Sequence, residues 1–144
     1  MVAGDAELIA RYRAFRNVAG PQMPGPILAA SAAAWRDETH VAANRALYAG
    51  KMAVAERMLG NRTGFRRPAG GFFLWLDTGY GEEATLRLWR EQGVKVLPGA
   101  YMGREIEPGK TQSNPGFSYI RVALVSDLST IMTALERVND FLKP

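Results

Sequence analysis

The sequence predicts an α/β fold in which long N-terminal helices precede a small mixed sheet that is covered by helices. Three observations support this prediction. The first 60 residues contain helix-forming segments and no strand-like run. Two later runs, 71–77 and 119–125, are rich in apolar and aromatic residues and have the length of strands. An amphipathic segment follows each of these runs, which indicates helices that pack on the sheet.

The first half predicts three helices. Gly4 or Asp5 caps a segment that runs to about Val18 and ends at Ala19-Gly20-Pro21. Pro26 is well placed to open a second helix, 27–36, because its fixed φ suits a first helical turn. A third helix follows residues 37–39 and ends at Gly60, with its buried face marked at helical spacing by Val41, Tyr48, Met52, Ala55 and Leu59.

The second half predicts alternating strands and helices. Its elements are a strand 71–77, a helix 82–92, a short strand 94–97, a loop 98–115, a strand 119–125 and a helix 127–142. Because the run 71–77 is apolar at consecutive positions, we expect both faces of its strand to be covered. We treat residues 1–144 as one domain, with a helical part at about 1–60 and an α/β part at about 61–144.

Composition excludes several classes of protein. The chain of 144 residues has no cysteine, so it has neither disulfides nor a thiolate metal site. Its longest weakly apolar stretch, Ile27 to Trp35, is far short of the roughly 20 residues that span a membrane, and we expect a cytoplasmic protein. The net charge is +4, but the arginines are spread along the chain and only Arg66-Arg67 is a tight pair. We therefore expect no binding of nucleic acid.

Familiar catalytic motifs are absent from the sequence. It contains no nucleophile elbow, no P-loop and no dinucleotide-binding fingerprint. The single histidine, His40, is expected to be a surface or capping group at a helix start, and Asp77 is expected to form a turn at a strand end. No residue is predicted to ligate a metal.

One charged residue interrupts an apolar strand. Arg121 lies within Tyr119-Ile120-Arg121-Val122-Ala123-Leu124-Val125. A charge in such a run is either paired or functional, because burying it alone costs several kcal/mol. A guanidinium also matches a carboxylate with two parallel hydrogen bonds. The alternative is an arginine on an edge strand that points to solvent.

Three segments together resemble the small domain of class I/II, fold-type I pyridoxal-phosphate-dependent aminotransferases. They are Pro68-Ala69-Gly70-Gly71-Phe72-Phe73-Leu74-Trp75, Gly93-Val94-Lys95-Val96-Leu97-Pro98-Gly99-Ala100-Tyr101-Met102-Gly103 and Tyr119-Ile120-Arg121-Val122-Ala123-Leu124. The helical first half, which begins near Gly4-Asp5-Ala6-Glu7-Leu8-Ile9, also fits the family. Within the family, the chain looks most similar to succinyl-diaminopimelate aminotransferases.

The resemblance implies a function for the intact protein: transfer of an amino group between an amino acid and a 2-oxo acid. It implies that Arg121 binds the α-carboxylate of the substrate. It also implies a homodimer, with the loop Gln22-Met23-Pro24-Gly25-Pro26 near the subunit interface. A carbon–sulfur lyase or decarboxylating relative, the aminotransferase-like domain of a transcriptional regulator, and a non-catalytic interaction domain remain alternatives.

The family's cofactor lysine has no counterpart in this sequence. That lysine follows serine-rich residues and precedes an arginine that holds the cofactor phosphate. Neither feature surrounds Lys51, Lys95, Lys110 or Lys143. The resemblance therefore implies that the large, cofactor-binding domain is absent. We expect this chain to be a C-terminal fragment that holds no pyridoxal phosphate covalently and is inactive alone.

Overall fold

A computed structural model describes residues 2–20, 23–62 and 64–143 of the chain. The chain divides into two compact units, Met1–Val41 and Ala42–Pro144. Pro21 and Gln22, where we expected the first helix to break and the interface loop to begin, lie outside the described residues. The predicted single domain of residues 1–144 stays a prediction.

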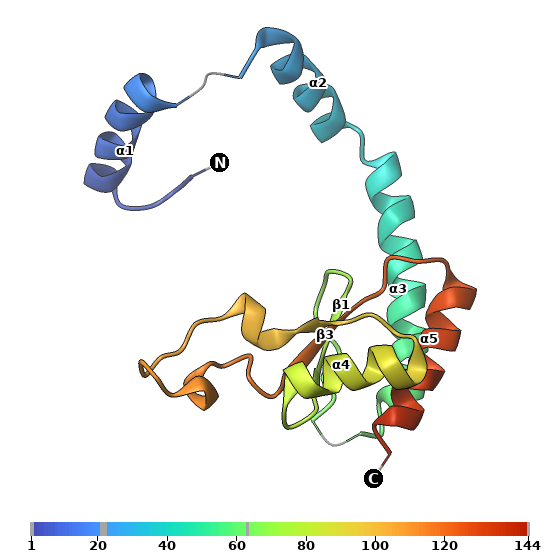
Figure 1. Cartoon of the computed structure of the whole chain (residues 1–144). Coiled ribbons are helices and arrows are strands. Elements are labelled where there is room, and N and C mark those ends of the chain that lie inside the picture. Colours follow the sequence, from blue (N-terminus) through green and yellow to red (C-terminus); the bar gives the residue numbers. More distant parts are fainter. Residues whose placement is uncertain (1, 21–22, 63, 144) are drawn as a thin grey trace. The chain divides into compact units, whose positions relative to one another are not determined.

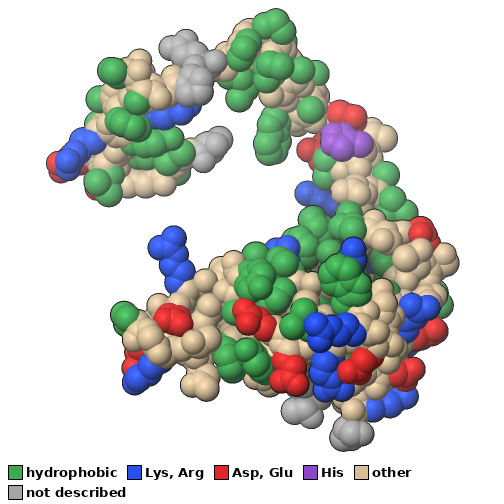
Figure 2. All heavy atoms as spheres, viewed as in Figure 1, with side chains coloured by type: hydrophobic (Ala, Val, Ile, Leu, Met, Phe, Trp, Pro, Cys, Tyr) green, Lys and Arg blue, Asp and Glu red, His purple; other side chains and the backbone are tan. Residues whose placement is uncertain are grey.

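The first unit contains two helices, α1 (Ala6–Ala19) and α2 (Gly25–Arg36). The Asp5 carboxylate caps α1 by accepting hydrogen bonds from the amides of Glu7 and Leu8, at 3.0 and 3.1 Å. A proline lies in the first turn of α2, as predicted. Neither helix has a buried residue, and hydrophobic side chains are exposed on both of them (Figure 2).

The second unit contains most of α3 (Thr39–Leu59) and all later elements (Figure 1). These are β1 (Phe73–Asp77), α4 (Gly81–Gln92), β2 (Leu97–Pro98), the 3₁₀ turns η1 (Gly99–Met102) and η2 (Thr111–Ser113), β3 (Tyr119–Ala123) and α5 (Leu128–Phe141). The predicted α/β fold class, with long helices before a small sheet, is confirmed.

The sheet has the strand order β1-β3-β2. The two predicted long strands are neighbours, with Trp75 opposite Arg121 in the β1–β3 register. Both pairings are antiparallel, so the expectation of a mixed sheet was wrong in this respect. The reason is topological: β3 lies between β1 and β2, and no two strands of the same direction become neighbours. The short strand is Leu97–Pro98, whereas we predicted 94–97.

Helices cover one face of the sheet. The side chains of Leu74, Leu76, Ile120 and Val122 point into a core that is completed by α3, α4 and α5. The alternate positions of β1 and β3 point the other way, and that face is only partly covered: Trp75 is 42% exposed. The expectation that both faces of the sheet are covered is therefore wrong for this chain. We call this face, formed by Phe73, Trp75, Tyr119, Arg121 and Ala123, the open face.

Candidate functional site

Arg121 lies on the central strand of the sheet, with Trp75 opposite it on β1 and Leu97 opposite it on β2. The alternative of an edge-strand arginine is therefore excluded. Its side chain is half-buried on the open face, beside apolar and aromatic neighbours. A cation in such surroundings needs a partner, because it has lost part of its hydration.

The partners of Arg121 within the chain are not carboxylates. Its guanidinium carbon lies 4.2 Å from the centroid of the Phe73 ring. Its Nη1 atom lies 3.4 Å from the sulfur of Met102, which is a weak acceptor. No acidic side chain among residues 2–20, 23–62 and 64–143 forms an ion pair with it. Most of its N–H donors are thus available for a ligand.

Aromatic side chains border Arg121 on the open face. The rings of Trp75 and Tyr119 meet edge to face, with centroids 6.4 Å apart and planes at 73°. Beside them lies a shallow hollow of about 330 Å³, lined by Trp75, Gly99, Met102, Gly103, Pro115, Gly116 and Tyr119. Met102 contacts Arg121 and also lines this hollow, so the guanidinium lies at its border.

The loop that carries Met102 is fixed by close backbone contacts. A Cβ added at Gly99 would lie 2.6 Å from the carbonyl oxygen of Gly116, so the two segments approach as only glycine allows. The buried Asn114 side chain connects them: its Nδ2 donates to the carbonyl of Ala100 and its Oδ1 accepts from the amide of Gly116, both at 2.9 Å. These contacts explain why a glycine occupies position 99, just before the turn that carries Met102.

The lysines of the chain do not fit a covalent cofactor site. Lys51 donates to the carbonyl of Leu124 at 3.1 Å and lies over the Tyr48 ring. Lys95 lies over the Trp89 ring, with Nζ 4.3 Å from its centroid. Lys110 and Lys143 form exposed ion pairs with Glu107 and Asp140. Each ammonium group therefore already has a partner, and none faces the hollow beside Arg121.

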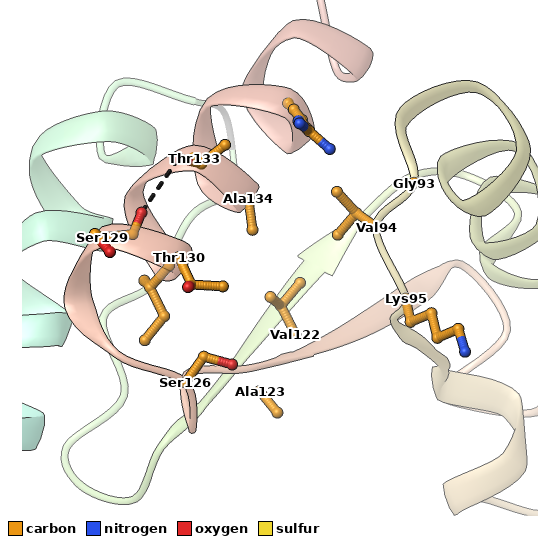
Figure 3. Close-up of a pocket in the computed structure, with 12 residues that line it drawn as sticks. Gly93, Val94, Lys95, Val122, Ala123, Ser126, Ser129, Thr130, Thr133 and Ala134 are labelled. Atoms are coloured by element: carbon orange, nitrogen blue, oxygen red, sulfur yellow. Dashed lines mark hydrogen bonds between the residues drawn. The ribbon is translucent and has the colours of Figure 1, made fainter.

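A second hollow, drawn in Figure 3, lies between α5, the Gly93–Lys95 segment and β3. Its hydroxyl groups and the start of α5 raise the question of a phosphate site. Asp127 already caps this helix, and hydrogen bonds from the Ser129 and Thr130 hydroxyls hold the pKa of its carboxyl well below the usual range. Lys95 and Arg137 also line the hollow, and the Asp127 carboxylate at the start of α5 places a negative charge near it (Figure 3). Its lining does not by itself identify this hollow as the site of the cofactor's phosphate.

The other singled-out residues have structural roles. His40 Nδ1 lies 3.1 Å from a carboxylate oxygen of Asp37 near the start of α3, and both side chains are exposed. Asp77 accepts a hydrogen bond from the amide of Gly79 at 3.0 Å and so forms the predicted turn. Across the described ranges, no cluster of acidic and histidine side chains has the arrangement of a metal site. No helix within these ranges is long and apolar enough to cross a membrane.

Sequence reasoning identified Arg121 but not its two contacts, Phe73 and Met102. Phe73 precedes Trp75 by two positions, so it shares the face of Arg121 and reaches it diagonally across the β1–β3 pair. Because side chains alternate between the two faces of a strand, this contact could be predicted once the β1–β3 register was known. The Met102 contact depends on the path of a loop, and no local pattern predicts that path.

Comparison with known proteins shows that the chain belongs to the fold-type I pyridoxal-phosphate-dependent aminotransferases, which agrees with the resemblance of its sequence motifs to that family. No family model matches the chain. The chain is 32% identical over 139 residues to the 4-dedimethylamino-4-oxo-anhydrotetracycline transaminase OxyQ of Streptomyces rimosus, covering 95% of this chain and 36% of that protein.

Solved structures agree with this relationship. An aminotransferase of Neisseria meningitidis is 36% identical with a TM-score of 0.81, covering 96% of this chain and 35% of its own. The aminotransferase AspB of Helicobacter pylori is 30% identical with a TM-score of 0.77, covering 96% and 34%. The chain thus spans about a third of the length of the relatives that it matches. None of these names specifies the succinyl-diaminopimelate type, so that assignment stays a prediction.

Proposed function

We propose that this chain is the substrate-binding part of a pyridoxal-phosphate-dependent aminotransferase, which moves an amino group between an amino acid and a 2-oxo acid. In this proposal, Arg121 binds the α-carboxylate that both substrates share. A carboxylate accepts two parallel N–H donors from one guanidinium, which fixes its orientation as well as its position. Holding the carboxylate in this way places the neighbouring α-carbon for the reaction.

One observation carries the proposal: a half-buried guanidinium on the central strand has no carboxylate partner among the described residues. A merely structural arginine in such surroundings is expected to be paired, because breaking or omitting its ion pair is costly. The contacts to the Phe73 ring and the Met102 sulfur leave the polar edge of the guanidinium uncommitted. The missing partner is supplied by the substrate.

Aminotransferases need a lysine that binds the cofactor covalently and a site for its phosphate, and we propose that this chain supplies neither. Aminotransferases use the electron-withdrawing ring of pyridoxal phosphate, which a lysine holds covalently. The lysines here are occupied by carbonyl, aromatic and carboxylate partners. We therefore propose that the lysine and the phosphate site belong to a large domain of the intact enzyme, that the enzyme is a cytoplasmic homodimer, and that this chain is inactive alone.

The replacement Arg121→Lys in the full-length enzyme tests the role of Arg121. Lysine keeps the charge but loses the two-pronged match, so one charge-assisted hydrogen bond disappears and the other loses its alignment. Such bonds contribute about 1.5–3 kcal/mol, so kcat/KM for amino acids and oxo acids should fall about 10–100-fold. Binding of the cofactor should stay nearly unchanged.

The matched control is Arg137→Lys. Arg137 donates to the backbone carbonyl of Gln92 at 3.0 Å and lies away from the open face, so this replacement should leave kcat/KM unchanged. An Arg121→Lys enzyme with wild-type kcat/KM and a lowered melting temperature would show instead that Arg121 only stabilises the sheet, and the proposed function would lose its support.

A further inference from the structure

The orientation of the Arg121 guanidinium is set by two contacts. The Phe73 ring lies against its carbon at 4.2 Å, and the Met102 sulfur lies 3.4 Å from Nη1. A guanidinium is planar, and a cation attracted to the face of a ring is held beside that face. Free arginine side chains sample many rotamers, so a fixed plane determines where the N–H donors point.

Phe73 is itself held in place by a column of rings. Its centroid lies 4.3 Å from that of Phe72, which lies 5.3 Å from that of Tyr48 on α3. At the far end, the ammonium group of Lys51 lies 4.8 Å from the Tyr48 centroid and donates to the carbonyl of Leu124, just after β3. We call Tyr48, Phe72 and Phe73 the aromatic column. It joins a helix of the core to the guanidinium on the open face.

We propose that Phe73 is a positioning residue for Arg121: the ring holds the guanidinium in the orientation in which it meets the α-carboxylate of the substrate. This inference rests on the proposed function of Arg121. Phe73 does not contact the carboxylate in this account and acts only through Arg121. Without the ring, the guanidinium samples more orientations, and binding the carboxylate then costs more conformational entropy because it must restrict them.

The effect should therefore depend on the carboxylate of the substrate. An attraction between a cation and a ring is worth about 0.5–2 kcal/mol, which corresponds to a change of about 2- to 30-fold in affinity. In the full-length enzyme, Phe73→Leu should lower kcat/KM for an α-amino acid by this factor. The corresponding amine without a carboxylate should react at nearly its wild-type kcat/KM, because Arg121 makes no contact with it.

Two variants separate positioning from structural support. Phe73→Tyr keeps a ring and should retain most of the wild-type kcat/KM. Phe141→Leu removes a different ring that lies 5.0 Å from the guanidinium carbon of Arg87, on α4, and is the matched control. It should change stability by a similar amount without changing the preference for α-amino acids over amines. If Phe73→Leu does not fold, a fluorinated phenylalanine at position 73 keeps the shape of the ring and weakens its attraction for a cation.

A double replacement distinguishes failure of this proposal from failure of the proposed function. Combined with Arg121→Ala, which removes the cation altogether, Phe73→Leu should cause much less than its own 2- to 30-fold loss, because the residue through which it acts is gone. If Arg121→Lys lowers kcat/KM while Phe73→Leu or the fluorinated ring leaves it unchanged, Phe73 does not position Arg121. If Phe73→Tyr lowers kcat/KM as much as Phe73→Leu does, an aromatic ring at position 73 is not what positions Arg121. If Arg121→Lys has no effect, the proposed function itself fails.

Discussion

Replacing Lys51 by methionine tests whether this lysine is structural, as its contacts indicate. Lys51 is half-buried, and Nζ donates to the carbonyl of Leu124 at 3.1 Å. A hydrogen bond to a charged group contributes about 1.5–3 kcal/mol, and the contact with the Tyr48 ring adds about 0.5–1 kcal/mol. Partial exposure to solvent screens both, and methionine keeps the packing of the stem. We therefore expect Lys51→Met to lower the free energy of unfolding by about 1–2 kcal/mol.

Equilibrium unfolding in urea, followed by circular dichroism, measures this loss. The matched control is Lys95→Met, since Lys95 also lies over an aromatic ring, at 4.3 Å, but donates no hydrogen bond to a backbone carbonyl of any described residue. Its loss should be at most about 0.5–1 kcal/mol. Equal stability of wild type and Lys51→Met, or equal losses for the two variants, would refute the argument that the carbonyl contacts of Lys51 hold α3 against the end of β3.

Two further predictions concern the last helix. Arg62 donates hydrogen bonds to the side chain and the carbonyl of Asn139 and, at 2.7 Å, to the carbonyl of Leu142. Arg62→Met should therefore lower the free energy of unfolding by about 2–3 kcal/mol, measured by urea titration. The control Arg66→Met, at an exposed position, should change it by less than about 0.5 kcal/mol. The pKa of the Asp127 carboxyl is lowered from 3.8 by hydrogen bonds from hydroxyls and an amide, so its stabilising effect is complete above about pH 4 and is lost as the pH falls below 3.8. The stability difference between wild type and Asp127→Asn, measured by thermal melts from pH 7 to pH 2, should therefore shrink at the acid end; a difference that grows there would contradict this.

The local signals in the sequence predicted most of the helices and the two long strands. Of the two candidate caps of the first helix, Gly4 and Asp5, the structure shows Asp5, and Asp127 caps α5 in the same way; such caps are locally readable because they depend on only a few neighbouring residues. The end of α4 at Gly93, with a φ of 66°, was also predictable, since this conformation favours glycine. Such features need no knowledge of the rest of the fold.

The sequence-based predictions that proved wrong concern features that depend on distant parts of the chain. Val94 and Val96 have the composition of a strand, but they pack on the core, and pairing begins only at Leu97. The apolar residues Phe73 and Trp75 indicate burial on both faces of β1, whereas the described chain covers only one. A strand's composition records what its faces contact in the functional protein, and it does not say which segment provides the contact.

The sequence singled out Arg121 as a candidate site residue but did not predict the residues that contact it. Arg121 was identified because a single charge in an apolar strand is locally conspicuous. The Phe73 contact required the β1–β3 register, and the Met102 contact required the course of the loop from Gly99 to Gly116. Strand pairing and loop paths are set by long-range packing, so they became visible only in the folded chain.

The central claim is that this chain supplies the substrate's arginine while the cofactor lysine comes from elsewhere in the intact enzyme. Borohydride reduction in the presence of pyridoxal phosphate, followed by peptide mass spectrometry, tests it most directly, because reduction makes the lysine–cofactor bond permanent. We expect the full-length enzyme to carry one cofactor per subunit on a lysine outside residues 1–144, and the isolated chain to carry no stoichiometric adduct. A stoichiometric adduct on Lys51, Lys95, Lys110 or Lys143, abolished by replacing that one lysine, would contradict the account.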